Sequence, residues 1–233
     1  AVLFAITGII AVLVWPRERA SKNDEVAAKT LSISDILRSF ILPTRNCRDF
    51  YLALVGRLLL MVGWSMVATY QLYILQKYVG LSVDESGTVI STMSVISMIV
   101  LIVTSMISGP ISDRLHRRKI IVAVGSVIIA IGIAIPIMMP TALGMMLYAG
   151  VAGTGYGIYI AVDQALNVDV LPSKEEAGKD LGILNLANTV GQVLAPVIVG
   201  GVVATSSYAT IFPIAIVCVL VGAVVIMLIR KVK

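Results

Sequence analysis

Apolar stretches about as long as a bilayer is thick recur along the whole chain, separated by short charged pieces. A helix needs roughly 20 apolar residues to cross the hydrocarbon layer of a membrane. Of the 233 residues, 58% are apolar and 13% are charged, whereas soluble domains are about one quarter charged. The short alternating segments of a transmembrane β-barrel are absent from the sequence. The chain is therefore not a soluble globular protein, and the pattern predicts an all-α, polytopic membrane helical bundle.

The apolar stretches can be marked as seven segments. They cover residues 1–15, 50–76, 88–108, 119–139, 142–162, 181–204 and 208–229. The first segment opens the chain without an initiator Met and without the charged region of a signal peptide. We therefore expect it to be the end of a spanning helix, and the chain to be part of a longer protein.

The distribution of positive charge predicts the orientation in the membrane. If each segment crosses once, 16 of the 18 Lys and Arg residues lie in or directly beside the loops on one side. Lys77 alone lies on the other side, and Arg57 falls inside a segment. Cytoplasmic loops carry an excess of Lys and Arg, so we expect an integral plasma (inner) membrane protein with a cytoplasmic C-terminus. Topology accounts for the net charge of +5, and nucleic acid is not an expected partner.

The long loop at residues 16–49 carries an amphipathic pattern between Leu31 and Leu42, which Pro43 ends. Its apolar residues share one helical face and Arg residues flank it, so the pattern is typical of a helix lying in the anionic cytoplasmic interface. A simple tether between two halves of a protein is the alternative.

Polar side chains are shared unevenly among the seven segments. The first, fourth and seventh carry almost none, whereas the other four carry polar stripes. Polar groups are costly in lipid, so we expect the first, fourth and seventh segments to face lipid. The other four are then expected to line an aqueous cavity.

The sharpest motif reads Gly-Pro-Ile-Ser-Asp-Arg-Leu-His-Arg-Arg over residues 109–118. It resembles the signature G-x-x-x-D-R-x-G-R-R of the major facilitator superfamily, which lies in the cytoplasmic loop joining helices 2 and 3 and in its counterpart joining helices 8 and 9. His116 stands in place of the second Gly. The resemblance implies a cytoplasmic gate whose members are Gly109, Asp113, Arg114, Arg117 and Arg118. The alternative is a solvated basic stop after a spanning helix.

A second resemblance lies in residues 163–182, which contain Asp-Val-Leu-Pro and Ala-Gly-Lys-Asp-Leu-Gly. These pieces are similar to the loop between helices 10 and 11 of disaccharide and glycoside permeases of the same superfamily. The resemblance implies that Asp163 or Asp169 meets Arg114 or Arg117 when the cavity is closed to the cytoplasm. Hydrated interface charges, worth about 0–1 kcal/mol per pair, are the alternative.

Together the two motifs imply a domain plan for the chain. Residues 1–15 are the end of transmembrane helix 6, residues 16–49 the central cytoplasmic loop, residues 50–229 the six-helix C-terminal half, and residues 230–233 a cytoplasmic tail. The N-terminal half of the same transporter is then the expected protein partner, and lipid surrounds the bundle.

Candidate substrate-binding residues lie on the polar segments. Arg57, Trp64 and Gln71 recur every seven residues and therefore share a helical face, on the segment that corresponds to helix 7 in facilitators. Aromatic rings suit the apolar faces of a sugar and amides suit its hydroxyls. The further candidates are Tyr70, Tyr156, Tyr159, Asn185, Asn188 and Gln192. Three other readings stay open: an Arg57 anchored to lipid headgroups or to Asp163, aromatic residues in ordinary belt positions, and amides that join helices.

The fifth segment also carries Gly153 and Gly157, whose G-x-x-x-G spacing permits close helix packing. The several glycines around them equally allow bending during transport.

These features predict a secondary active transporter that moves a small-molecule substrate, by resemblance a sugar with proton coupling. No Asp or Glu lies near the middle of a segment, so the carboxylate that couples protons is expected in the N-terminal half. Efflux of drugs or other small molecules, and a non-transporting receptor or structural subunit, are the alternatives. With no H-E-x-x-H or G-x-S-x-G motif and with one His and two Cys, we expect no enzyme, no catalytic residues, no metal and no cofactor.

Overall fold

The computed structural model describes residues 47–115, 117–172 and 177–230, apart from the side chain of Asp113. Every regular element in these ranges is a helix, and six helices are long and apolar enough to cross a membrane. They are α3 (Arg48–Thr69), α5 (Val83–Leu115), α6 (Arg118–Met138), α7 (Ala142–Asp169), α8 (Ala177–Thr205) and α9 (Ile211–Met227). The predicted helical membrane bundle is confirmed. The first predicted segment and the amphipathic pattern of the long loop lie outside the described residues.

Short elements connect α3 to α5. After a break at Tyr70 the chain forms α4 (Gln71–Ile74) and the π-helical turn η2 (Leu75–Val79), and η3 (Tyr208–Thr210) similarly precedes α9. Gly80 ends η2 in the left-handed conformation, with φ of 85°, which glycine adopts without steric cost. Ser82 and Glu85 then form a reciprocal capping box: Ser82 N donates to Glu85 Oε2 over 2.9 Å, and Glu85 N donates to Ser82 Oγ over 3.3 Å. This box starts α5.

Two helices continue past the apolar segments from which they were predicted. Helix α5 extends to Leu115, so most of the motif at residues 109–118 lies in its last turns and not in a loop. Helix α7 extends to Asp169, so Asp163 lies inside a helix, whereas the sequence pattern had assigned it to the following loop. The physical reason is that backbone hydrogen bonding continues wherever the residues tolerate a helix, while hydropathy reports only the part that lies in hydrocarbon.

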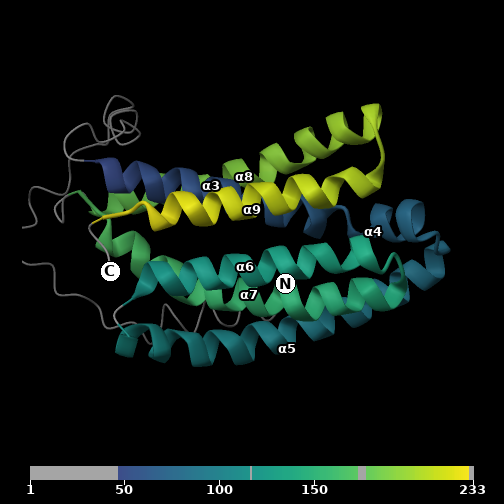
Figure 1. Ribbon diagram of the computed structural model, residues 1–233, viewed down its shortest axis with the longest axis horizontal. Helices are drawn as coiled ribbons and strands as arrows, with labels where there is room; N and C mark the ends of the chain where they lie inside the picture. The colour runs from purple at the N-terminus through teal and green to yellow at the C-terminus, as the bar shows by residue number, and fades with distance from the viewer. Residues whose placement is uncertain (1–46, 116, 173–176, 231–233) are drawn as a thin grey trace, which may run out of the picture. The chain divides into compact units, whose positions relative to one another are not determined.

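The six long helices form two groups of three, as Figure 1 shows. Helix α7 packs against α5 and α6 in one group, and α3 packs against α8 and α9 in the other. Contacts between α6 and α9 join the groups. The middle helix of each group, α7 or α3, is therefore the most enclosed, whereas α5 and α8 are the least buried of the six.

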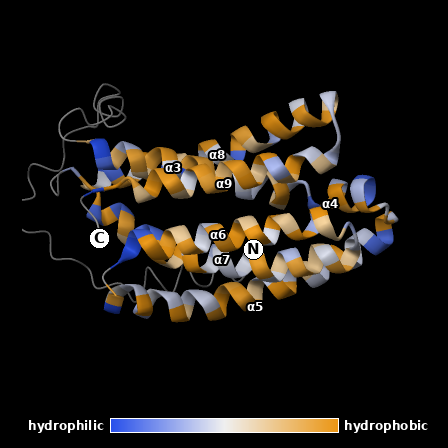
Figure 2. Ribbon diagram, in the orientation of Figure 1, coloured by the Kyte–Doolittle hydropathy of each residue, from blue (hydrophilic) through white to orange (hydrophobic). Residues whose placement is uncertain are grey.

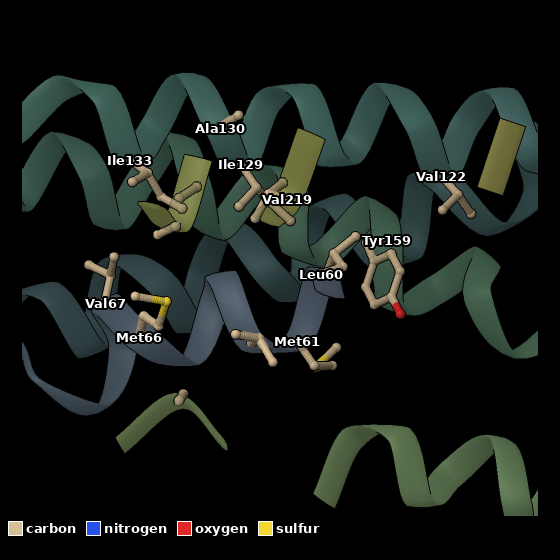
Figure 3. Packing of buried hydrophobic residues seen from close by; sticks show 14 of the residues in the cluster. Leu60, Met61, Met66, Val67, Val122, Ile129, Ala130, Ile133, Tyr159 and Val219 are labelled. Carbon is tan, nitrogen blue, oxygen red and sulfur yellow. The ribbon is translucent and has the colours of Figure 1, made fainter. Parts of the chain in front are cut away.

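Buried apolar residues of α3, α6 and α9 meet in the core (Figure 3). Leu60, Ile129 and Val219 are fully buried there. On the outside, the exposed residues of α6 and α9 form stripes that are apolar: Ile120, Val124, Val127 and Ile131 on α6, and Val217, Leu220, Val221 and Val224 on α9. Figure 2 shows the apolar residues along these helices and the hydrophilic ones gathered toward the helix ends. Such stripes suit contact with lipid.

The glycines of α7 serve packing on both sides of the helix. A Cβ at Gly155 would lie 2.5 Å from the carbonyl oxygen of Gly125 in α6, and a Cβ at Gly153 would lie 3.0 Å from Val100 Cγ2 in α5. A Cβ at Gly157 would collide with Thr104 of α5. Small residues let two helix backbones approach closely, so the structure supports the packing interpretation of the G-x-x-x-G spacing.

A proline pair near the end of α6 explains one contact of the half-buried Tyr78. Residue 140 is Pro and has no N–H, so the carbonyl of Pro136 lacks its usual helical donor. The hydroxyl of Tyr78 donates to that carbonyl over 3.0 Å. This bond ties η2 to the end of α6 and satisfies an acceptor that would otherwise stay unpaired.

Candidate functional site

A buried ion pair lies between α3 and α7. Arg57 Nη1 lies 3.1 Å from Asp163 Oδ2, and the two residues are only 2% and 3% exposed. Two charges can be held out of water only when they are paired and hydrogen-bonded. The two side chains therefore depend on each other.

Three amide side chains complete this charged cluster. Arg57 Nε donates to Asn188 Oδ1 over 2.8 Å, and Arg57 Nη2 donates to Asn185 Oδ1 over 3.1 Å. On the other side of the pair, Asn167 Nδ2 donates to Asp163 Oδ2 over 3.0 Å. The cluster therefore joins α3, α7 and α8. It is defined here as Arg57, Asp163, Asn167, Asn185 and Asn188 and called the polar cluster below.

An aromatic stack lies next to the polar cluster on the same two helices. The rings of Trp64 and Tyr156 are parallel within 2°, with centroids 4.3 Å apart. Trp64 follows Arg57 by seven residues and Tyr156 precedes Asp163 by seven, as expected for antiparallel helices in contact. Two turns are about 10 Å, so the stack lies roughly that distance along the helices from the ion pair. Both rings are half-buried.

Two buried tyrosine hydroxyls lie near the stack. Tyr148 and Tyr159 are each 1% exposed; the Tyr148 hydroxyl lies near Gln71 and the Tyr159 hydroxyl near Asp163, neither with the geometry of a full hydrogen bond. The Tyr156 ring lies 6.3 Å from that of Tyr159, and Trp64 lies 6.5 Å from Tyr148. Buried polar groups in native proteins are nearly always satisfied, so these two hydroxyls belong to the polar surroundings of the cluster and the stack.

The structure brings together six of the nine predicted cavity residues: Arg57, Trp64, Tyr156, Tyr159, Asn185 and Asn188. The remaining three lie at its edge or outside it. Tyr70 donates its hydroxyl to the carbonyl of Pro196 over 3.3 Å, and Gln192 is exposed on α8. Gln71 opens α4 beyond the break in the helix, where its side chain lies near the Tyr148 hydroxyl. Helix α3 carries the seven-residue face from Arg57 to Trp64, and Gln71 follows it after the break at Tyr70.

The residues of the predicted gate lie at the basic end of α5, α6 and α7. Arg118 Nη1 pairs with Asp169 Oδ2 over 2.8 Å and also donates to the carbonyl of Ala165 over 3.1 Å. Arg114 and Arg117 are exposed, and Gly109 is half-buried in α5. Asp113 contributes only its backbone to the described structure, as part of α5.

Asp163 does not join this gate in the structure. The sequence predicted that Asp163 or Asp169 meets Arg114 or Arg117, with an anchoring of Arg57 by Asp163 as an alternative. In the structure Asp163 pairs with Arg57, which was the alternative. Asp169 pairs with Arg118. Asp163 precedes Asp169 by six residues, about 9 Å along α7, which sets it too deep for the arginines at the helix ends.

Two members of the site, Asn167 and Tyr148, were not predicted. Asn167 follows Asp163 by four residues on one helical face, which is a usable signal once α7 is known to continue so far. Tyr148 is separated from Tyr156 by eight residues in a Gly-rich stretch, and its role depends on packing across to α3.

Comparisons with known proteins agree with this architecture. The family model of the Major Facilitator Superfamily matches residues 52–233. The structure is similar to that of a peptide transporter POT solved in complex with sulfate, with a TM-score of 0.69 and 17% identity over 86% of this chain and 42% of the other. It is also similar to the POT family transporter PepTSo, with a TM-score of 0.66 and 16% identity over 82% of this chain and 39% of the other.

The chain thus spans about two fifths of each of these solved structures. At such low identity the likeness concerns the fold alone. A comparison with curated proteins finds no match.

Proposed function

Because the chain belongs to the major facilitator superfamily, a family of membrane transporters, we propose that it forms the C-terminal half of a secondary transporter working by alternating access. Family membership implies a transporter and not an enzyme. In this proposal residues 50–229 rock against an N-terminal half, and the substrate lies between the two. The single observation that carries the assignment of a site is the buried polar cluster beside the Trp64–Tyr156 stack.

The substrate in this proposal is a small polar solute of the sugar class. The partly exposed aromatic rings of the stack suit the apolar face of a pyranose, and amides of the polar cluster suit its hydroxyls. The hydroxyls of Tyr148 and Tyr159, which lie near Gln71 and Asp163, add two more groups able to bond to it. A ligand site of this kind is mostly apolar with a few placed polar groups.

Asp163 is the proposed coupling carboxylate of this half. The sequence pattern pointed to the absent N-terminal half because no acid lies near the middle of an apolar segment. The burial of Asp163 against Arg57 supports a second possibility within this chain. Ionisable residues inside membrane helices commonly mark ion and proton pathways. Protonation of Asp163 removes its attraction for Arg57 and frees the guanidinium to donate to a substrate hydroxyl.

The proposed function is tested by uptake into proteoliposomes that hold the full-length transporter. A panel of labelled disaccharides and dipeptides is offered with and without an inward proton gradient. Dipeptides are included because the two similar structures are described as transporters of the peptide and POT type. Saturable, gradient-dependent accumulation of a disaccharide is the expected result. Accumulation of dipeptides only would replace the sugar assignment, and export of unrelated solutes would favour the efflux alternative.

The aromatic stack gives a first quantitative prediction. Changing Trp64→Ala should raise the KM for the transported sugar roughly 10-fold, because stacking on an aromatic ring contributes about 0.5–1.5 kcal/mol beyond its buried area. The matched control is Tyr73→Ala, since Tyr73 is 50% exposed and lies outside the stack. Equal KM values for the two variants would remove Trp64 from the binding site.

The gate gives a second prediction. Reversing either charge of the Arg118–Asp169 pair, by Arg118→Asp or Asp169→Arg, should slow transport severalfold, because like charges then meet at the closed end. The double exchange should recover most of the rate while protein levels stay constant. A double variant that stays as slow as the single ones, measured as initial uptake rate, would mean that this pair does not close the cavity.

A further inference from the structure

An apolar groove opens between α5 and α6 near their basic ends, with α7 as its floor. Its volume is about 280 Å³. The lining residues are Thr104, Ile107, Ser108 and Ile111 of α5, Ile121 and Val124 of α6, and Ile158 of α7. Ile107, Ile111 and Val124 are exposed on the outer surface of the bundle. The groove therefore lies where the bundle meets the membrane, outside the polar cluster and the aromatic stack.

The stripe of α5 that lines the groove ends in a positive charge. Residues 104, 107, 108 and 111 follow helical spacing, and the next position on this face is Arg114. Arg114 is exposed at the end of α5. The charge of this side chain lies about 4.5 Å further along the helix axis than Ile111.

The facing wall of the groove ends in the same way. Ile121 and Val124 are one turn apart on α6, and Arg117 precedes Ile121 by four residues, directly before the helix begins at Arg118. Arg117 is exposed too. Two exposed arginines thus stand in the sequence just beyond the ends of the two walls, which are mostly apolar.

We propose that this groove binds one anionic phospholipid of the surrounding leaflet. One acyl chain lies along Ile107, Ile111 and Val124, and the phosphate lies between Arg114 and Arg117. Arginine guanidinium groups bind phosphate oxygens with two parallel hydrogen bonds, and basic pockets between spanning helices suit acidic headgroups. The charge complementarity between the paired arginines and a phosphate selects an anionic lipid over a zwitterionic one.

A hydroxyl below the arginines suits the glycerol region of such a lipid. Ser108 lines the groove, is 6% exposed, and its hydroxyl has no partner among the described residues. Ser108 precedes Arg114 by six residues, about 9 Å along α5. A small movement of the Ser108 side chain brings its hydroxyl to an ester carbonyl of a lipid whose phosphate lies at Arg114.

A second groove provides an internal comparison. It lies between α5 and α7, has a volume of about 440 Å³ and is lined by Ile96, Val100, Leu143, Met146, Leu147, Gly150, Val151 and Thr154. No Lys or Arg occurs in residues 83–103 or 142–169, which form its walls. It is larger but carries no positive end, so it should accept acyl chains without regard to headgroup.

The experiment titrates the purified full-length transporter, in detergent, with phosphatidylglycerol or phosphatidylcholine of identical acyl chains and counts bound lipids by native mass spectrometry. The wild-type protein is expected to retain one phosphatidylglycerol with roughly 10-fold higher affinity than phosphatidylcholine. The double change Arg114→Gln with Arg117→Gln should abolish that preference. The matched control is Arg48→Gln with Arg230→Gln, which removes the same charge from two exposed positions away from the groove. This control should retain the preference for phosphatidylglycerol.

A third variant tests the groove itself. Val124→Trp fills the groove and should lower phosphatidylglycerol retention at least fivefold, whereas Val217→Trp on the exposed stripe of α9 should not. An unchanged thermal unfolding midpoint shows that each variant is folded. Equal retention of the two lipids by the wild-type protein would overturn the proposal. The proposal would also be overturned if the two arginine double variants lost the phosphatidylglycerol preference equally, or if Val124→Trp retained phosphatidylglycerol like the wild-type protein. Displacement of phosphatidylglycerol by inorganic phosphate alone would have the same meaning.

Discussion

Changing Asp163→Ala is expected to abolish transport and to lower the free energy of unfolding by about 3–5 kcal/mol. That range is typical when one partner of a buried ion pair is removed, because the other charge stays buried without compensation. Here the charge left behind is Arg57, which is 2% exposed. Asn185 and Asn188 accept two of its hydrogen bonds but carry no negative charge. The measurements are initial uptake in proteoliposomes and thermal unfolding of the full-length transporter in detergent.

An exposed ion pair serves as the matched control. Asp169→Ala removes the same chemical group from a pair whose side chains are 27% and 36% exposed, and it should cost about 0–1 kcal/mol. Equal destabilisation by the two variants would contradict the assigned difference in burial.

A double variant separates stability from function. Arg57→Met combined with Asp163→Leu removes both charges and should recover most of the lost stability, since apolar replacements of buried ion pairs are often neutral or better. Transport should stay absent because the polar groups of the site are gone. Uptake by the double variant at the wild-type rate would remove the ion pair from the mechanism.

Changing Gly155→Leu should prevent the bundle from assembling. A Cβ at this position would lie 2.5 Å from the carbonyl oxygen of Gly125 and 2.7 Å from the backbone nitrogen of Ile129. Both contacts are with the backbone of α6, which cannot move aside as a flexible side chain can. Overpacking ordinarily costs about 1–3 kcal/mol, and separating two helices costs more. The expected result is loss of the monodisperse peak in size-exclusion chromatography and of all uptake.

Gly200→Ala is the control for the glycine prediction. No atom lies within 4 Å of a Cβ built at Gly200 in α8, and Ala is favoured over Gly in a helix by about 0.5–1 kcal/mol. This variant should therefore elute like the wild-type protein and unfold at the same or a slightly higher temperature. A Gly155→Leu protein that behaves equally well would show that α6 and α7 do not approach so closely.

The class of fold could be predicted from the sequence because it follows from length and hydropathy. A stretch such as residues 119–139 has no stable place outside a bilayer, and the structure has α6 at residues 118–138. The family was likewise predictable, since residues 109–118 carry a pattern of residue types at fixed spacing. Helix ends beyond the hydrocarbon were less predictable, as α5 and α7 show, because polar residues tolerate both helix and loop.

The site could be predicted only in part, and the reason lies in which contacts are local. Trp64 and Arg57 share one helix, so helical periodicity alone related them. The partner of Arg57 was undecided between lipid headgroups and Asp163, which lie at very different depths. That choice depends on how far α7 continues and on which of its side chains reach α3, and both are visible only in the structure.

Composition, segment length and charge asymmetry by themselves thus determined a polytopic helical bundle and the side on which its basic loops gather. Each of these properties arises from the free energy of transferring single residues between water and lipid. That free energy does not depend on which other residues they contact. Only the tertiary structure decided that Asp163 belongs to Arg57 and Asp169 to Arg118, and that Tyr156 stacks on Trp64. The physical reason is that these pairings depend on which faces of α3, α6 and α7 meet, and the glycines that set the close approach of α6 to α7 carry no polar signal in the sequence.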